Sequence, residues 1–304
     1  MKEKALILGV IAVAAGCAKN EINIVQHEGY TVVTQTRGPE LGYNESSGVR
    51  ILNIDGFAFK DLDKDGELDV YEDWRRSVAE RARDLASQMP VERICGLMLY
   101  SSAVDAMTDG LTPQQEKYLR DDFIRHMLVR NVADAETGAA WSNRVQAFCE
   151  AEPFGIPSNN STDPRNYTNG QANTNTYKPE PDGEFDPDGT SKISLWPREV
   201  GMAATFDLDV VRRHGEVVSS EYRALGLTTA LSPQADLSTD PRWRRFYGTF
   251  SESPELNRDI AREYCDAFQT TESSADGWGG GSVNCMVKHW PGGGTGEAGR
   301  RTTS

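Results

Sequence analysis

Short apolar runs alternate with amphipathic stretches over most of the chain. Apolar runs of roughly four to eight residues bounded by turn residues predict buried strands. We expect such strands at residues 94–100, 126–129, 154–157, 228–231 and 283–290. Two segments with apolar residues at helical spacing, 206–225 and the stretch that follows Ser253 and Pro254, predict helices, because Ser is a good N-cap and Pro suits the first helical turn. This alternation predicts a parallel α/β sheet or barrel.

Two polar segments interrupt the pattern. Residues 158–192 are rich in Asn, Thr, Pro, Gly and Asp, and we expect a long surface loop there. Residues 17–48 are also polar, and we interpret them as a tether that leads into a folded part at 49–304.

The N-terminus has the pattern of an export signal. Lys2 and Lys4 precede an apolar run at 5–15 that is too short to span a bilayer, and small residues lie directly before Cys17. This predicts a lipoprotein signal peptide at 1–16, lipidation of Cys17, and anchoring to a bacterial membrane on its periplasmic or cell-surface side. The alternative is a plain secretory signal in which Cys17 has no special role.

Charge and cysteine content narrow the function further. The 304 residues carry a formal net charge of −14, which argues against nucleic acid as a partner, because phosphates require a basic surface. The four cysteines after Cys17 show no metal-binding spacing, and we expect buried thiols. The lipid at Cys17 is the only contact with a membrane that the sequence predicts.

An acidic segment at 61–72 fits the twelve-residue calcium loop at every position. Gly66 supplies the sharp turn in its centre. The residues before it do not look helical, so we expect a single structural site rather than a paired sensor. The predicted ligands are Asp61, Asp63, Asp65, the Glu67 carbonyl, Asp69 through water, and Glu72. The alternative is an acidic surface turn without a bound ion.

Polar residues follow two of the predicted strands. The sequence Asp-Pro-Arg-Trp-Arg-Arg at 240–245 lies after the strand at 228–231, and Lys288 and His289 lie at the end of the strand at 283–290. Barrels place their sites at the C-terminal ends of parallel strands, and charged donors and acceptors beside Trp suit a neutral polyol. Each piece taken alone is equally compatible with a structural role.

Together these segments resemble glycoside hydrolase family 3, which includes β-glucosidases and β-xylosidases. The motifs are the segments 229–245 and 248–256 and the Lys-His-Trp-Pro-Gly-Gly-Gly run at 288–294, with further matches at 196–207, 156–165 and 71–75. The resemblance covers roughly residues 50–300. It implies a (β/α)8 TIM-barrel-type domain, which we expect to be incomplete at its C-terminal end.

The resemblance also implies the roles of particular residues. Asp163, Arg245, Lys288 and His289 are expected to bind the hydroxyls of the terminal sugar of an oligosaccharide or β-glycoside, and Arg300 is a further candidate. Arg244 stands where the family has Gly, which could narrow this subsite. The implied activity is O-glycosyl hydrolysis of β-linked glucosides or xylosides with retention of configuration.

A retaining glycosidase needs two carboxylates about 5 Å apart. In the family the nucleophile lies well after the Lys-His pair, so we expect it beyond Ser304 and expect the chain as given to be inactive and poorly soluble. No His follows His289, which disfavours the subgroup of N-acetylglucosaminidases with a His acid/base.

A Gly-x-Gly-x-x-Gly pattern at 294–299 lacks a following helix, so we expect no dinucleotide or other organic cofactor. The main rival to the hydrolase is a non-catalytic, calcium-stabilised sugar-binding lipoprotein or a pseudoenzyme fragment.

Overall fold

A computed structural model describes residues 19–103, 105, 107–108, 110–129, 135–164, 166, 193–243, 245–271 and 277–289. The chain divides into two compact units, residues 1–84 and 85–304. The acidic loop at 61–72 therefore belongs to the first unit, whereas the sequence analysis placed it inside the barrel domain.

The first unit contains two antiparallel sheets. Strands β1 (Ile22–His27), β2 (Tyr30–Gln35) and β3 (Leu41–Tyr43) form one sheet, and β4 (Arg50–Ile54) and β5 (Phe57–Asp61) form a hairpin. The Gln35 side chain links them, because its Oε1 accepts a hydrogen bond of 3.1 Å from the Ala58 amide. Residues 22–43 thus differ from the expected tether. In β2 only alternate residues such as Thr31 and Val33 are buried, so no continuous apolar run marks the strand.

The second unit is built on a five-stranded parallel sheet. Its strands β6 (Tyr100–Ser102), β7 (His126–Leu128), β8 (Asn159–Thr162), β9 (Thr229–Ala230) and β10 (Asn284–Cys285) pair in the order β10-β9-β8-β7-β6. Each neighbouring pair is parallel. The described α-helices of this unit are α2 (Val91–Leu97), α3 (Pro113–Arg120), α4 (Ala135–Ala151), α5 (Glu199–Ala203), α6 (Leu208–Ala224) and α7 (Pro254–Gln269), and α1 (Val78–Gln88) spans the boundary between the two units. The predicted alternation of strand and helix is confirmed for this part of the chain.

Two predicted strands were placed wrongly. Residues 94–97 belong to helix α2, and the strand starts only at Tyr100. Residues 153–155 form a short 3-10 helix, and the strand follows at Asn159. A short apolar run does not distinguish a buried strand from a buried helical turn, because both bury apolar side chains. Strand β8 was missed since its residues are polar, yet Asn160 and Thr162 are fully buried.

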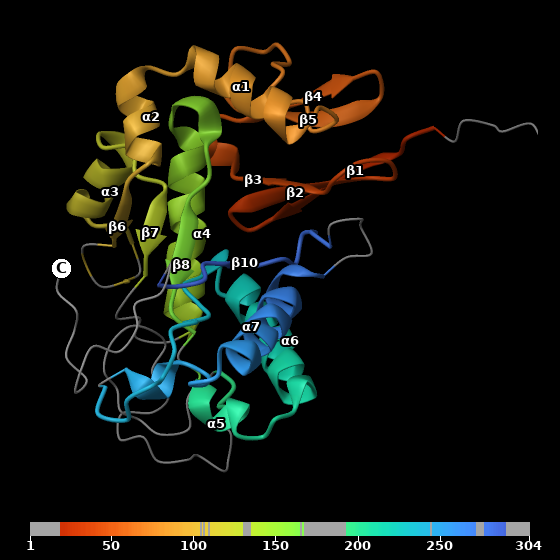
Figure 1. Cartoon of the computed structure of the whole chain (residues 1–304). Coiled ribbons are helices and arrows are strands. Elements are labelled where there is room, and N and C mark those ends of the chain that lie inside the picture. Colours follow the sequence, from red (N-terminus) through yellow and green to blue (C-terminus); the bar gives the residue numbers. More distant parts are fainter. Residues whose placement is uncertain are drawn as a thin grey trace, which may run out of the picture. The chain divides into compact units, whose positions relative to one another are not determined.

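Helices α6 and α7 carry much of the core and lie side by side (Figure 1). Ser253 caps α7 as predicted, with its Oγ accepting a hydrogen bond of 3.3 Å from the Leu256 amide. Gly215 allows the close approach, because a Cβ there would lie 2.5 Å from Cβ of Ala267. Buried residues from both helices join the core with α4 and the strands, among them Val211, Val218, Tyr222, Ile260, Tyr264, Phe268, Trp141, Val145, Met127 and Ala230.

The cysteines only partly follow the expectation of buried thiols. Cys149 is buried, and Cys265 and Cys285 are half-buried, but Cys95 is exposed, so the expectation is wrong for Cys95. All four are free thiols in this structure. In the described part of the chain, no helix combines the length and the apolar character that a membrane span would need.

His214 on α6 lies in an aromatic cluster. Its ring packs against Trp196, Tyr264 and Phe268 at centroid distances of 5.4, 5.5 and 6.4 Å. The side chain is buried, and its Nδ1 has no hydrogen-bond partner. Burial disfavours the imidazolium and lowers the pKa of His214 from 6.5 to about 4. The residue is thus a core residue on a helix face.

This burial predicts a specific loss of stability in acid. The unfolded chain binds a proton at His214 below pH 6.5, while the folded chain does so only near pH 4. The free energy of unfolding is therefore highest above pH 6.5 and falls as the pH drops toward 4. The loss approaches roughly 3 kcal/mol, at about 1.4 kcal/mol for each pKa unit. Urea unfolding of wild type and His214→Phe across this range should show a stability difference that shifts in favour of the variant as the pH falls. The control His27→Phe, at an exposed position, should keep the wild-type pH dependence; a constant difference between wild type and His214→Phe would contradict the prediction.

Candidate functional site

Three neighbouring strands deliver the candidate residues to one edge of the sheet. Asp163 directly follows β8, Gln234 and Asp236 come shortly after β9, and Lys288 and His289 come shortly after β10. Because β8, β9 and β10 are parallel neighbours, these segments leave the sheet at the same side. The backbone keeps them together beyond the strands, since the amide of Ala235 donates to the carbonyl of Lys288 at 2.7 Å and the amide of Lys288 donates to that of Pro233 at 3.0 Å.

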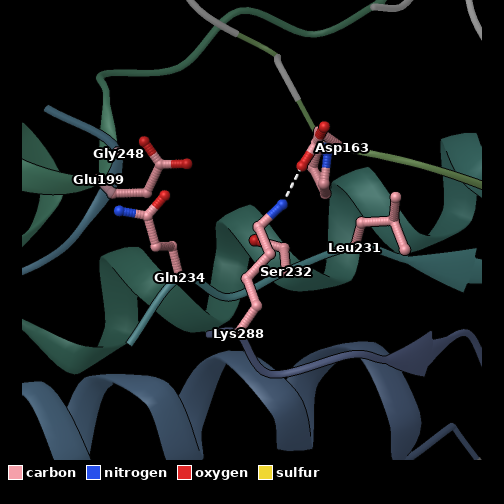
Figure 2. Close-up of a pocket in the computed structure, with 8 residues that line it drawn as sticks. Asp163, Glu199, Leu231, Ser232, Gln234, Gly248 and Lys288 are labelled. Carbon is pink, nitrogen blue, oxygen red and sulfur yellow. Dashed lines mark hydrogen bonds and ion pairs between the residues drawn. The ribbon is translucent and has the colours of Figure 1, made fainter. Parts of the chain in front are cut away.

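Lys288 and Asp163 form an ion pair across this edge (Figure 2). The Lys288 Nζ donates a hydrogen bond to Oδ1 of Asp163. Only 19% of the Lys288 side chain and 12% of the Asp163 side chain are exposed. At this burial, loss of one partner would leave the other charge poorly solvated, so the pair fixes both side chains.

A second pair joins Asp236 and His289. The buried carboxylate of Asp236 accepts from His289 Nδ1 at 2.8 Å and from the His289 amide at 3.3 Å. With the proton on Nδ1, the other ring nitrogen is an acceptor, and it lies 3.0 Å from an Arg245 guanidinium nitrogen. Arg245 also donates to Oε1 of Gln234 at 2.6 Å. Asp236 therefore orients the imidazole, and the imidazole and Gln234 hold the guanidinium.

A pocket opens beside these residues. It encloses about 190 Å³, including its open mouth, and its lining comprises Asp163, Pro164, Glu199, Leu231, Ser232, Gln234, Gly248 and Lys288. Figure 2 shows the Lys288 side chain rising between Asp163 on one side and Gln234 with Glu199 on the other. The buried Nε2 of Gln234 has no hydrogen-bond partner, which leaves one amide donor in the pocket wall.

This set of groups suits a small ligand with several hydroxyls. Carboxylates accept, ammonium and guanidinium groups donate, and a hydroxyl can do both.

The structure brings together Asp163, Arg245, Lys288 and His289, four of the five residues that the sequence analysis assigned to the subsite. Arg300, Arg244 and Cys17 lie outside the described residues. Gln234, Glu199 and Asp236 were not among the predicted site residues, although Gln234 and Asp236 lie within the motif at 229–245. The position of Gln234 and Asp236 just after a predicted strand was the signal that could have found them.

The acidic loop forms a separate feature in the first unit. One carboxylate oxygen from each of Asp61, Asp63 and Asp65 lies within 4.8 Å of the others. Glu72 accepts hydrogen bonds from the amides of Leu62 at 2.6 Å and Asp69 at 3.1 Å. Among the residues that the structure describes, Asp61, Asp63 and Asp65 form a group that could hold a metal ion.

Known proteins share this combination of sheet and motifs. Residues 188–303 match the family model described as "Glycosyl hydrolase family 3 N terminal domain". A "Periplasmic beta-glucosidase/beta-xylosidase" of Dickeya chrysanthemi is 36% identical over 262 residues, which are 84% of this chain and 38% of the relative. A "Probable beta-glucosidase C" of Aspergillus flavus is 32% identical over 78% of this chain and 36% of its own length. The predicted family resemblance is confirmed, and the chain spans little more than a third of these relatives.

Solved structures agree on the fold. A β-glucosidase of Erythrobacter marinus superposes with a TM-score of 0.59 at 24% identity, over 77% of this chain and 28% of that one. A β-glucosidase of Listeria innocua, solved with isofagomine, gives a TM-score of 0.51 at 21% identity over 73% of this chain and 27% of its own. The second unit is therefore an α/β domain of the TIM-barrel type, as predicted.

The buried contact between Asp236 and His289 yields a stability prediction. Asp236→Asn keeps the shape of the side chain but removes its charge and one of its two acceptor oxygens, so either Nδ1 or the amide of His289 loses its partner. We expect the free energy of unfolding to fall by about 1–3 kcal/mol, as for an unsatisfied buried group. Asp121→Asn, the same change at an exposed position, should cost less than about 0.5 kcal/mol. Equal urea midpoints for the two variants would contradict the orienting role.

Proposed function

We propose that this chain supplies the sugar-recognition part of a retaining glycoside hydrolase that acts on terminal β-linked glucose or xylose. The observation that carries the proposal is that Asp163 and Lys288 line a small pocket at the C-terminal edge of the parallel sheet, with the contact between Arg245 and His289 at the same edge. The names of the relatives from Dickeya and Aspergillus support the same substrate class.

In this proposal different residues bind different hydroxyls of the sugar. Lys288 donates to one sugar hydroxyl while Asp163 accepts from a neighbouring one, which suits the two adjacent hydroxyls of a pyranose ring. Arg245 donates to a further hydroxyl, and its direction is fixed by Gln234 and His289. Because the donors and acceptors are held before the sugar arrives, little ordering is needed on binding.

The chemical step requires two more carboxylates. Asp163 and Asp236 already hold Lys288 and His289, so we assign them to recognition and positioning. We assign the nucleophile, which would form the covalent glycosyl intermediate, and the acid/base to other residues of the protein.

Lys288→Met in the full-length protein should lower kcat/KM for an aryl β-glucoside by roughly 30- to 1,000-fold, the equivalent of about 2–4 kcal/mol for a lost charged hydrogen bond. The matched control is Lys117→Met, which removes a lysine from an exposed pair with Asp122 and should leave kcat/KM within about twofold. Steady-state kinetics with aryl β-glucoside and aryl β-xyloside provide the measurement.

A second variant separates binding from folding. Lys288→Met leaves Asp163 without its cation, and adding Asp163→Asn removes that buried charge. The double variant should therefore regain thermal stability while kcat/KM stays low. Recovery of activity together with stability would show that the pair is structural only, and sugar binding without any turnover by the full-length wild type would favour the non-catalytic sugar-binding lipoprotein.

We further propose that the protein is exported and held to the membrane by a lipid on Cys17, because small residues precede this Cys after a short apolar run. The periplasmic relative from Dickeya supports export. Cys17→Ser should move the protein from the membrane fraction to the soluble fraction, which immunoblotting of fractionated cells would measure. Membrane retention of Cys17→Ser would contradict the lipid anchor.

A further inference from the structure

The acidic loop between β5 and α1 contains a buried oxygen that lacks a partner. Asp61 is fully buried at the end of β5. Its Oδ2 pairs with Arg50 at 3.0 Å, but its Oδ1 has no hydrogen-bond partner. A buried charged oxygen without a partner is costly, so its presence points to a ligand that satisfies it.

Two other carboxylates meet Asp61 at this point. One oxygen from each of Asp61, Asp63 and Asp65 lies within 4.8 Å of the others. Oxygens that bind one Ca²⁺ at about 2.3–2.6 Å can be up to about 5 Å apart, so these three fit around a single ion. The ligand implied by the unpartnered oxygen is therefore a cation rather than a hydroxyl or an amide.

The local charge points to the same conclusion. Asp61, Asp63, Asp65, Asp69 and Glu72 place five carboxylates within twelve residues, and Glu67 adds a sixth. Arg50 neutralises part of this charge through Oδ2 of Asp61, but its side chain is 61% exposed. A divalent cation among the carboxylates would remove the remaining repulsion.

We propose that residues 61–72 bind one Ca²⁺ and that this ion stabilises the first unit. Asp61, Asp63 and Asp65 supply three carboxylate oxygens, Glu67 supplies its backbone carbonyl, Asp69 acts through a water, and Glu72 supplies the carboxylate that closes the loop. Glu72 is buried and is held against the start of the loop by the Leu62 amide. This ligand set, with six or more oxygens in a flexible loop, suits Ca²⁺ better than the smaller Mg²⁺.

The loop is also tied to the helix that follows it. The Tyr71 amide donates to a carboxylate oxygen of Asp84 at 3.0 Å, and Arg81 donates to the Tyr71 carbonyl at 2.8 Å. An ion that fixes the loop would thereby connect the end of the β4–β5 hairpin to α1. The role is structural, and it does not depend on the proposed sugar chemistry.

The test compares two charge-removing substitutions within the same loop. Asp65→Asn removes a side-chain ligand at an exposed position, so the variant should still fold. Glu67→Gln removes the same charge from a residue that contributes only its backbone carbonyl, which makes it the matched control. The protein is stripped with EGTA, and CaCl₂ or MgCl₂ is then added while the melting temperature and the heat of binding are measured.

We expect wild type to bind about one Ca²⁺ per chain, with the melting temperature raised by on the order of 5 °C at saturating Ca²⁺ and by less in Mg²⁺. Asp65→Asn should lose roughly tenfold or more in Ca²⁺ affinity, yet melt no lower than wild type in EGTA, because repulsion in the loop is reduced. Glu67→Gln should keep its affinity within about threefold of wild type. Three outcomes would overturn the proposal: no effect of Ca²⁺ on wild type, an equal effect of Mg²⁺, or equal loss of affinity in both variants.

Discussion

Parallel pairing of β8, β9 and β10 is the constraint on which the candidate site depends. The hydrogen bonds between these strands fix where each one ends, and the chain then places Asp163, Gln234 and Lys288 within one pocket. The pairing continues past the strands, with Gln234 and Lys288 forming a further parallel bridge. Residues that are more than a hundred positions apart in the sequence thus meet because the backbone, and not their own attraction, brings them there.

An ion pair and a hydrogen-bonded pair then fix the side chains at that edge. Lys288 and Asp163 are both mostly buried, and Asp236, the partner of His289, is fully buried. The ion pair contributes little net stability, because desolvation offsets much of the attraction between its charges. The effect of both pairs is to hold donors and acceptors in one arrangement, which is what recognition of a polyol requires. Stability comes instead from the apolar contacts of α4, α6 and α7 with the strands.

The two acidic regions of the chain differ in the partners of their carboxylates. At the edge of the parallel sheet, each of the carboxylates of Asp163 and Asp236 has a cationic or hydrogen-bonding partner from the segment after β10. In the loop at 61–72 the carboxylates outnumber the cations near them, and a buried oxygen of Asp61 has no partner. Carboxylates that are matched by such partners indicate a site for a neutral ligand, whereas converging carboxylates in excess of the nearby cations indicate a site for a cation.

The alternation of strand and helix, the helices α6 and α7, and the polar residues that follow two strands could be predicted from the sequence, because these features depend on local patterns. The cap at Ser253, the helical spacing after it, and polar residues directly after apolar strands are all visible in one dimension. Three elements became visible only in the tertiary structure: the polar strand β8, the helix at 91–97 and the sheet at 22–43. In β8, Ser161 donates to the Met127 carbonyl and Asn159 accepts from Thr228 and Thr229, so burial is satisfied by partners that lie far away in the sequence. Local hydropathy does not contain that information, because the partners exist only once the strands have paired.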